Sequence, residues 1–488
     1  MGFFRKRYQK SHFTKENTKT QENVSLEKTL DQFRDCSDLV QNDLPELQVS
    51  YVYIENLVNP QKVKEYLADP FDTLKSPDVG LILNEKRYKK TTESKSLYKG
   101  ILNGEAAIFF KDEAYLVNLF GPETRPMNES GTETVITGPH EAFNESAGQN
   151  ISLVRRRIKS SHLKVYKITV GEVTLTDVYL LYLDNIANKG FVEQVKQRIE
   201  SVRMDGILES TMLVQMIEEN PYSFFPQFLT TERPDTVASK ILEGKIAGIT
   251  DGSPTAFIAP TSFFEFFNSP EDYYQRWALA TFLRLLRYTA FFIAIFFTAF
   301  YVAVTTFHYE MIPRTLLYTL LESRSKVPFP PLIEALIMEI TIELLREAGA
   351  RLPTKIGQTI GIVGGIVIGQ SAVQAGIASN ILIIAVAISA IASFVIPNYI
   401  MSASIRLIRF GLILLAGIWG NLGIMFGLGL VLIHLTGIMN LGTSFLTPIA
   451  PISKSDLRDI VIRAPFSKLI TRPSQSVATN RVRQKKKL

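Results

Sequence analysis

The chain has 488 residues, of which 46% are hydrophobic and 20% charged, and its formal net charge is +6. A single cysteine, Cys36, excludes a disulfide framework within the chain and fits a reducing compartment. The basic residues gather at both ends and beside apolar segments, which is typical of the cytoplasmic flanks of a membrane protein and disfavours nucleic acid as a partner.

The first part of the sequence is polar and punctuated by turns, as in a globular protein. Residues 1–30 are basic and polar with few apolar anchors, so we expect a disordered tail. Residues 31–137 are expected to form a first α/β subdomain, with a helix over residues 60–68. Its strands are predicted at residues 49–54, 80–83 and 106–110.

A second α/β subdomain is expected over residues 138–275, beginning at the Gly138-Pro139 turn. The turn Asp251-Gly252-Ser253-Pro254 predicts a hairpin between residues 247–250 and 256–259. Further strands are predicted at residues 163–170 and 173–183, and amphipathic helices at 191–202 and 210–218.

Residues 276–440 are expected to form a helical transmembrane domain, followed by a basic cytoplasmic tail over residues 441–488. Residues 288–307 are an uninterrupted apolar run of about 20 residues, the length that crosses a hydrocarbon core. Further candidate spans are residues 356–378, 381–399 and 410–439, of which the last is long for one crossing and short for two.

Charged residues beside these spans predict the orientation of the chain. Arg276, Arg284 and Arg287 precede the first span, and a Lys/Arg-rich tail follows the last. By the positive-inside tendency both termini lie on the cytoplasmic side, which requires an even number of crossings.

Glycine recurs every four residues at Gly357, Gly361, Gly365 and Gly369. One side of this helix therefore lacks side chains and allows close packing, either between subunits or between two helices of a monomer. The opposite side has an apolar middle and amide groups toward one end, which suits a pore with a hydrophobic constriction. This candidate pore-lining set is Thr359, Val363, Ile366, Val367, Gln370 and Gln374.

Three carboxylates, Glu339, Glu343 and Glu347, are spaced four residues apart on one side of a helix over residues 330–351. Ionised groups in or near a bilayer are costly unless they are paired or hydrated. The row is either an ion entrance or coupling site, or a solvated face. Whether this helix crosses the membrane is open.

Enzyme motifs are missing from the sequence: it has no phosphate-binding glycine loop ending in Lys-Ser/Thr, no HExxH and no paired Cys or His ligands. We therefore expect no catalytic activity, no cofactor and no metal site. Asn421 and His434, which interrupt the last apolar block, are expected to make structural hydrogen bonds.

Several stretches together resemble the A subunits of bacterial spore germination receptors, the GerA family. They are Gly138-Pro139-His140-Glu141-Ala142-Phe143, residues 150–158 ending in Arg155-Arg156-Arg157-Ile158, Phe225-Pro226, residues 231–235, 269–274 and 356–378, and Asp459, Arg463, Pro465, Arg472 and Pro473. The resemblance runs from about residue 35 to about residue 475.

This resemblance implies a subunit of a nutrient receptor in the spore inner membrane. It also implies two partners, a transporter-like B subunit that binds the nutrient and a C-subunit lipoprotein, and a ring of A subunits, a pentamer, that forms a cation channel. Two alternatives remain open: a scaffold subunit that does not conduct, and a secondary transporter, which the lack of repeated spans disfavours.

Overall fold

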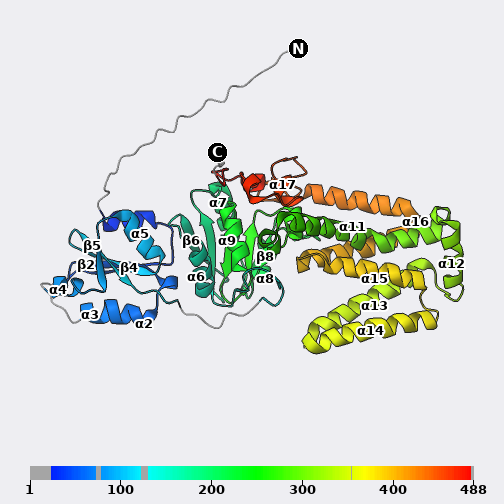
Figure 1. The fold of residues 1–488 in the computed structure, drawn as a ribbon, viewed down its shortest axis with the longest axis horizontal. Helices are drawn as coiled ribbons and strands as arrows, with labels where there is room; N and C mark the ends of the chain where they lie inside the picture. The colour runs from blue at the N-terminus through cyan, green and yellow to red at the C-terminus, as the bar shows by residue number, and fades with distance from the viewer. Residues whose placement is uncertain (1–23, 73–77, 123–129, 353, 485–488) are drawn as a thin grey trace, which may run out of the picture. The chain divides into compact units, whose positions relative to one another are not determined.

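The computed structural model describes residues 24–72, 78–122, 130–352 and 354–484, and over residues 354–363 it describes the backbone alone. The predicted disordered tail over residues 1–30 thus falls mostly outside the described residues, and the first helix begins at Leu26. The chain divides into two compact units (Figure 1). The first comprises residues 1–34 and 38–122, and the second residues 35–37 and 123–488.

The first unit is built on a five-stranded antiparallel sheet in the order β1-β2-β4-β5-β3. Apolar side chains such as Val49, Ile108 and Val117 are buried on this sheet together with Leu67 and Leu83 from the helical segments. Its elements are α1 Leu26–Gln32, β1 Leu39–Leu44, β2 Val49–Ile54, η1 Glu55–Leu57, α2 Pro60–Val63, η2 Lys64–Ala68, α3 Asp69–Asp72, α4 Val79–Leu83, β3 Tyr88–Thr91, α5 Ser94–Leu102, β4 Glu105–Phe110 and β5 Glu113–Asn118.

The strand predicted at residues 80–83 is wrong, because these residues belong to the helix α4. Val79 and Leu83, one helical turn apart, are buried, whereas Leu81 between them is 71% exposed. Periodicity cannot distinguish a buried strand from a buried helical turn in an apolar run this short.

The second unit begins with another five-stranded antiparallel sheet, in the order β6-β7-β9-β10-β8. Helices α6 and α9 share a core with one face of the sheet, and α7 and α8 with the other. The hairpin predicted around Asp251-Gly252 is confirmed, and the strand predicted from residue 173 begins at Thr176. The elements are α6 Ala147–Arg157, β6 Leu163–Val170, β7 Thr176–Leu183, α7 Lys189–Glu200, α8 Ser210–Ile217, β8 Leu229–Thr231, α9 Pro234–Leu242, β9 Ile246–Thr250, β10 Ala256–Ala259, η4 Phe263–Phe267 and α10 Glu271–Tyr274.

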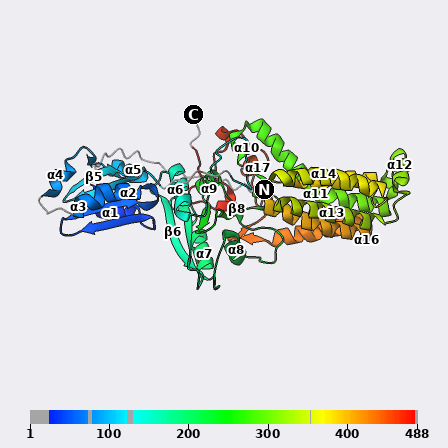
Figure 2. The same cartoon turned by 90° about the horizontal axis from the view of Figure 1, so that it is seen from below.

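A bundle of long helices follows in the same unit, and the helices lie lengthwise beside one another in both views (Figures 1 and 2). Helix α11 contacts α13, α15 and α16, and α13 contacts α14. Among the described residues, α11 and α16 are the two helices long and apolar enough to cross a membrane. The bundle comprises α11 Trp277–Phe307, η5 Tyr309–Met311, α12 Arg314–Arg324, α13 Pro331–Arg351, α14 Thr354–Gln374, α15 Asn380–Phe394 and α16 Tyr399–Gly437.

The last hydrophobic block is a hairpin of two helices, which explains its ambiguous length. Its backbone turns at Gly420, where φ is 60° and ψ is −139°. A Cβ on Gly427 would lie 2.4 Å from Leu412 Cδ2, so residues 421–437 fold back on residues 399–419. The block begins at Tyr399 rather than at residue 410, which leaves room for both helices.

The C-terminal segment after α16 returns to the sheet of the second unit. Thr479 N donates a hydrogen bond to Ile186 O (2.8 Å), and Arg472 Nε donates one to Leu242 O (2.8 Å). The short elements in this segment are β11 Met439–Asn440, β12 Thr443–Ser444, α17 Leu457–Ile460, η6 Phe466–Lys468 and η7 Ser474–Ser476.

Candidate functional site

Helix α14 carries the predicted glycine ladder and pore-lining set. The surroundings of Gly357, Thr359, Gly361 and Val363 are not described, because the structure gives only the backbone there. Nothing lies within 4 Å of a Cβ built on Gly365, and a Cβ on Gly369 would meet only Ile383 Cγ2, at 3.9 Å. The described part of the glycine side is therefore nearly uncovered within one chain.

The opposite side of α14 is uncovered as well. Ile366 is 55% and Val367 54% exposed, and Gln370 and Gln374 are also exposed. The helix instead meets α13 through a third side, where a Cβ on Gly364 would lie 3.0 Å from Leu345 Cδ2. In its described part, α14 thus leaves a continuous arc, from the glycines round to Val367, free for other molecules.

The carboxylate row of α13 is split between the interior and the surface of the bundle. Glu339 Oε2 lies 2.8 Å from Arg409 Nη2, and both side chains are fully buried. Thr298 Oγ1 donates a hydrogen bond to Glu339 Oε1 (2.9 Å). Glu347, in contrast, is 59% exposed and pairs with Arg351 at 2.5 Å.

Glu343, between these two, is surrounded by arginines. Arg346, Arg409 and Arg406 lie 3.2, 3.2 and 3.3 Å from its carboxylate. Two nitrogens of Arg409, Nε and Nη1, are buried and find no hydrogen-bond partner among the described residues. Three cations therefore share the two carboxylates of Glu339 and Glu343. The sequence interpretation omitted Arg406 and Arg409, although arginines at the start of an apolar helix are a recognisable signal.

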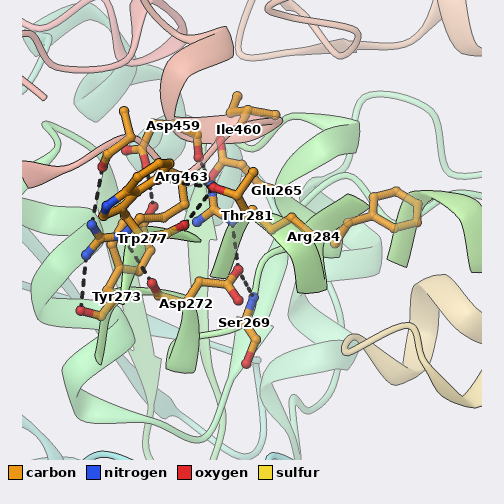
Figure 3. Close-up of polar contacts among 12 residues, drawn as sticks. Glu265, Ser269, Asp272, Tyr273, Trp277, Thr281, Arg284, Asp459, Ile460 and Arg463 are labelled. Atoms are coloured by element: carbon orange, nitrogen blue, oxygen red, sulfur yellow. Dashed lines mark hydrogen bonds and ion pairs between the residues drawn. The ribbon is translucent and has the colours of Figure 1, made fainter. Parts of the chain in front are cut away.

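A second buried charge cluster joins the sheet to the first long helix (Figure 3). Asp272 in α10 accepts hydrogen bonds from Arg284 Nε and Arg287 Nη1 of α11, each 2.8 Å long. The side chains of Asp272, Arg284 and Arg287 are 1%, 0% and 9% exposed. Of the three arginines counted before the first span, only Arg276 is exposed, because the other two hold Asp272.

The C-terminal segment completes this cluster. Arg463 Nε donates a hydrogen bond to Asp272 O (3.1 Å), and its guanidinium lies 3.9 Å from the ring centroid of Phe466. Arg284 Nη1 donates to Asp459 O, and Tyr273 Oη donates to Asp459 Oδ1 (3.1 Å). Helix α10, helix α11 and the C-terminal segment therefore meet at one set of paired side chains, which includes Asp459 and Arg463 from the resemblance.

A cavity of about 250 Å³ adjoins the cluster, and its lining includes the charged residues Lys240, Glu243, Glu265 and Asp459. Burial would raise the pKa of Glu265, but Lys240, at 2.9 Å, and Lys245, at 2.5 Å, lower it to about 2. Burial, and next the charge of Glu243, raise the pKa of Asp459. These charges are paired with one another, which suits a structural joint better than catalysis.

Side chains that could hold a metal ion do not gather in the described part of the chain. Over residues 24–72, 78–122, 130–352 and 354–484, no group of three or more His, Cys, Asp or Glu side chains could hold a metal ion. His434 makes a hydrogen bond, as predicted, since its Nε2 lies 3.1 Å from Ser223 Oγ. The side chain of Asn421 also makes one, from Nδ2 to Met311 Sδ (3.4 Å), and its backbone N donates to His308 Nε2 (3.3 Å).

Comparisons with known proteins agree with the resemblance seen in the sequence. The family model described as "Bacillus/Clostridium GerA spore germination protein" matches residues 27–475. The chain is 44% identical over 409 residues to spore germination protein GerQA of Bacillus cereus, covering 83% of this chain and 82% of that protein. It is 38% identical over 450 residues to the uncharacterized membrane protein YfkQ of Bacillus subtilis, covering 90% and 88%.

A solved structure also matches the N-terminal part. The crystal structure of the N-terminal domain of the A subunit of the Bacillus megaterium spore germinant receptor GerK3 covers 49% of this chain and 94% of its own, at 28% identity and a TM-score of 0.37. With a family match over residues 27–475 and relatives of 38% to 44% identity along most of their length, the chain belongs to the GerA family of spore germination proteins.

Proposed function

We propose that the chain is the A subunit of a nutrient receptor in the spore inner membrane, and that copies of it assemble into a ligand-gated cation channel that triggers germination. Membership of the GerA family supports the role in germination. The insertion in a bilayer and the channel are argued below from the helices. The pentameric ring and the spore inner membrane are taken from the resemblance to the family.

The lengths of the apolar helices support insertion in a bilayer. Residues 288–307 of α11 and 399–419 of α16 each extend about 30 Å, which matches a hydrocarbon core. Tyr399 and Trp419, at the two ends of the second segment, are 65% and 54% exposed. Aromatic side chains at such positions are typical of the two membrane interfaces.

Both ends of the helical bundle that connect to the sheet lie close together. Phe263 N, in η4 between the sheet and α11, donates a hydrogen bond to Phe445 O, in the segment after α16 (2.8 Å). We propose that the two termini face the spore core, on the same side of the membrane.

The observation that carries the channel proposal is the uncovered arc of α14. The glycine side would pack closely against the neighbouring copy, and the side with Ile366, Val367, Gln370 and Gln374 would line the central pore. Val363 and Val367 would form its dry constriction. Glu339 and Glu343 would couple α13 to the rest of the bundle, and Glu347 is the member of that row available at an ion entrance.

The proposed partners follow from the family role. A transporter-like B subunit would bind the nutrient, and a lipoprotein C subunit would complete the complex. The nutrient would open the ring only to the extent that the complex binds it more tightly in the open state.

The test is single-channel recording from the purified chain in planar bilayers, with Val363→Ala, Val367→Ala and the control Leu422→Ala. Leu422 is 77% exposed on the second half of α16, outside the proposed pore. We expect currents whose open probability rises in the two valine variants but not in the control. Equal open probabilities in all variants would show that the gate does not lie on α14. No current from chains shown to be inserted and oligomeric would favour the scaffold alternative.

A further inference from the structure

Helix α12, which follows α11 at the end of the bundle away from α10, is amphipathic with a wide apolar side. At about 100° per residue, its four leucines at positions 316, 317, 320 and 321 span an arc of about 140°. Thr315, Thr319 and Glu322 occupy the opposite side. Such a helix normally buries its whole apolar side against a protein core or another apolar surface.

The protein covers only the middle of this apolar side. Leu320 is 6% exposed, whereas Leu316 and Leu321, which flank it in opposite directions around the helix, are 50% and 59% exposed. The helix thus rests on the bundle along a narrow strip, with an apolar margin on each side of it.

Polar contacts hold α12 in this position. Arg324 Nε lies 3.7 Å from Glu334 Oε2, and the carboxylate of Glu334 is fully buried in α13. Ser323 Oγ accepts a hydrogen bond from Asn380 N at the start of α15 (3.1 Å). The orientation of α12 on the bundle is therefore fixed, and so is the exposure of its two apolar margins.

Other apolar side chains are exposed at the same end of the bundle. Tyr309 is 56% and Met311 57% exposed, in the turn between α11 and α12. Trp419 is at this end too, because Asn421 N donates its hydrogen bond to His308 Nε2 just after α11. Both views place α12 at this end of the helices (Figures 1 and 2).

We propose that α12 lies in the headgroup region of the membrane at this end of the bundle, with Leu316 and Leu321 in the upper part of the acyl chains. A lipid surface surrounds the bundle and covers both margins at once, whereas a protein docked on one margin would leave the other bare. Exposed basic residues at its two ends, Arg314 and Lys326, suit contact with lipid phosphates. The inference rests on the proposed insertion of α11 and α16 in the membrane.

The experiment is quenching of a single tryptophan in vesicles of phosphatidylcholine and phosphatidylglycerol brominated either near the headgroup or deep in the chains. Both native tryptophans, Trp277 and Trp419, are first replaced by Phe. The reporters are Leu321→Trp on an apolar margin, Thr319→Trp on the polar side of α12, and Phe292→Trp in the middle of α11, where the native side chain is 56% exposed.

We expect shallow bromines to quench Leu321→Trp several-fold more than Thr319→Trp, and deep bromines to quench Phe292→Trp most. Equal quenching of the two α12 reporters would overturn the inference, as would deep quenching of Leu321→Trp. In both cases quenching of Phe292→Trp would leave the membrane insertion intact. If Phe292→Trp is not quenched either, the proposed insertion itself is wrong.

Discussion

The carboxylate of Asp272 accepts a 2.8 Å hydrogen bond from Arg284 Nε, and both side chains are removed from solvent. Arg287 lies at the same distance from this carboxylate. One acidic group of α10 thus neutralises two cations at the base of α11. A movement of α10 away from α11 would break this ion pair. Such a movement is unfavourable, because a buried unpaired charge is costly.

We predict that Asp272→Asn destabilises the protein by about 3–5 kcal/mol, since it removes the carboxylate that pairs with Arg287 and leaves Arg284 only the more distant Asp459, at 3.8 Å. Thermal unfolding of the purified chain in detergent measures this as a lower Tm. Asp184→Asn is the control, because Asp184 pairs with Lys189 on the surface, where the side chains are 40% and 79% exposed. That variant should lose at most about 1 kcal/mol. Similar losses in the two variants would show that Asp272 is not the counter-charge of both arginines.

The sequence predicts the order of the domains well, because composition alone separates the polar first part from the apolar helices. It failed at pairings between distant residues. Nothing in the sequence pairs Asp272 with Arg463, which lie 191 positions apart, or Glu339 with Arg409. The short apolar run at residues 80–83 failed for another reason, since burial of Val79 and Leu83 decided between helix and strand.

Glu339 and Glu347 lie on one helix, yet we predict that loss of charge destabilises the protein strongly at Glu339 and hardly at Glu347. Glu339→Gln leaves Arg409 buried in the bundle without its closest partner, so it should cost about 3–5 kcal/mol. Glu347→Gln removes an exposed pair with Arg351 and should cost at most about 0.5 kcal/mol. Thermal unfolding of both variants in the same detergent measures the two losses of stability, and equal losses would contradict the prediction.

A double variant separates the cost of the unpaired charge from a loss of packing. Glu339→Gln with Arg409→Met removes both charges, so it should recover part of the stability that Glu339→Gln loses. If the double variant is less stable than the sum of the two single changes, the pair does not act as a buried ion pair.

Gly420 permits the hairpin of α16, and we predict that Gly420→Ala disrupts it. The residue has a φ of 60°, and a Cβ there would lie 2.9 Å from His308 Nε2 and 3.1 Å from Phe307 Cβ. Strain in this backbone region costs about 1–3 kcal/mol before the contacts are counted. Gly429→Ala is the matched control, because no atom of the described residues lies within 4 Å of its Cβ position.

The hairpin itself can be followed by cysteine crosslinking between its two halves. With Cys36→Ala as background, a cysteine pair replacing Leu412 and Gly427 should form a disulfide, because these positions face each other. Gly420→Ala should lower the yield of this disulfide and Gly429→Ala should not. An undiminished yield in Gly420→Ala would mean that the turn tolerates a side chain.

Glu133 makes part of the stability depend on pH. Its carboxylate accepts a hydrogen bond from Thr231 Oγ1 (2.6 Å) in β8. Burial raises the pKa of Glu133 to about 7, with Glu232 and Asp235 adding to the rise and Thr231 and Arg233 opposing it. The folded state therefore holds a proton that the unfolded chain releases near the ordinary glutamate pKa of 4.5. This contribution to stability is complete below that lower value and is lost as the pH rises through about 7.

We therefore predict that Glu133→Gln, which mimics the protonated form, unfolds at nearly the same temperature as the wild type at about pH 4 and at a higher temperature at about pH 8. A pKa that differs by one between the folded and unfolded states corresponds to about 1.4 kcal/mol, so the gap in stability should reach about 3–4 kcal/mol. Glu193→Gln, at an exposed position of α7, should unfold like the wild type at both pH values. A gap between wild type and Glu133→Gln that does not widen with pH would mean that Glu133 is ionised in the folded protein throughout this range.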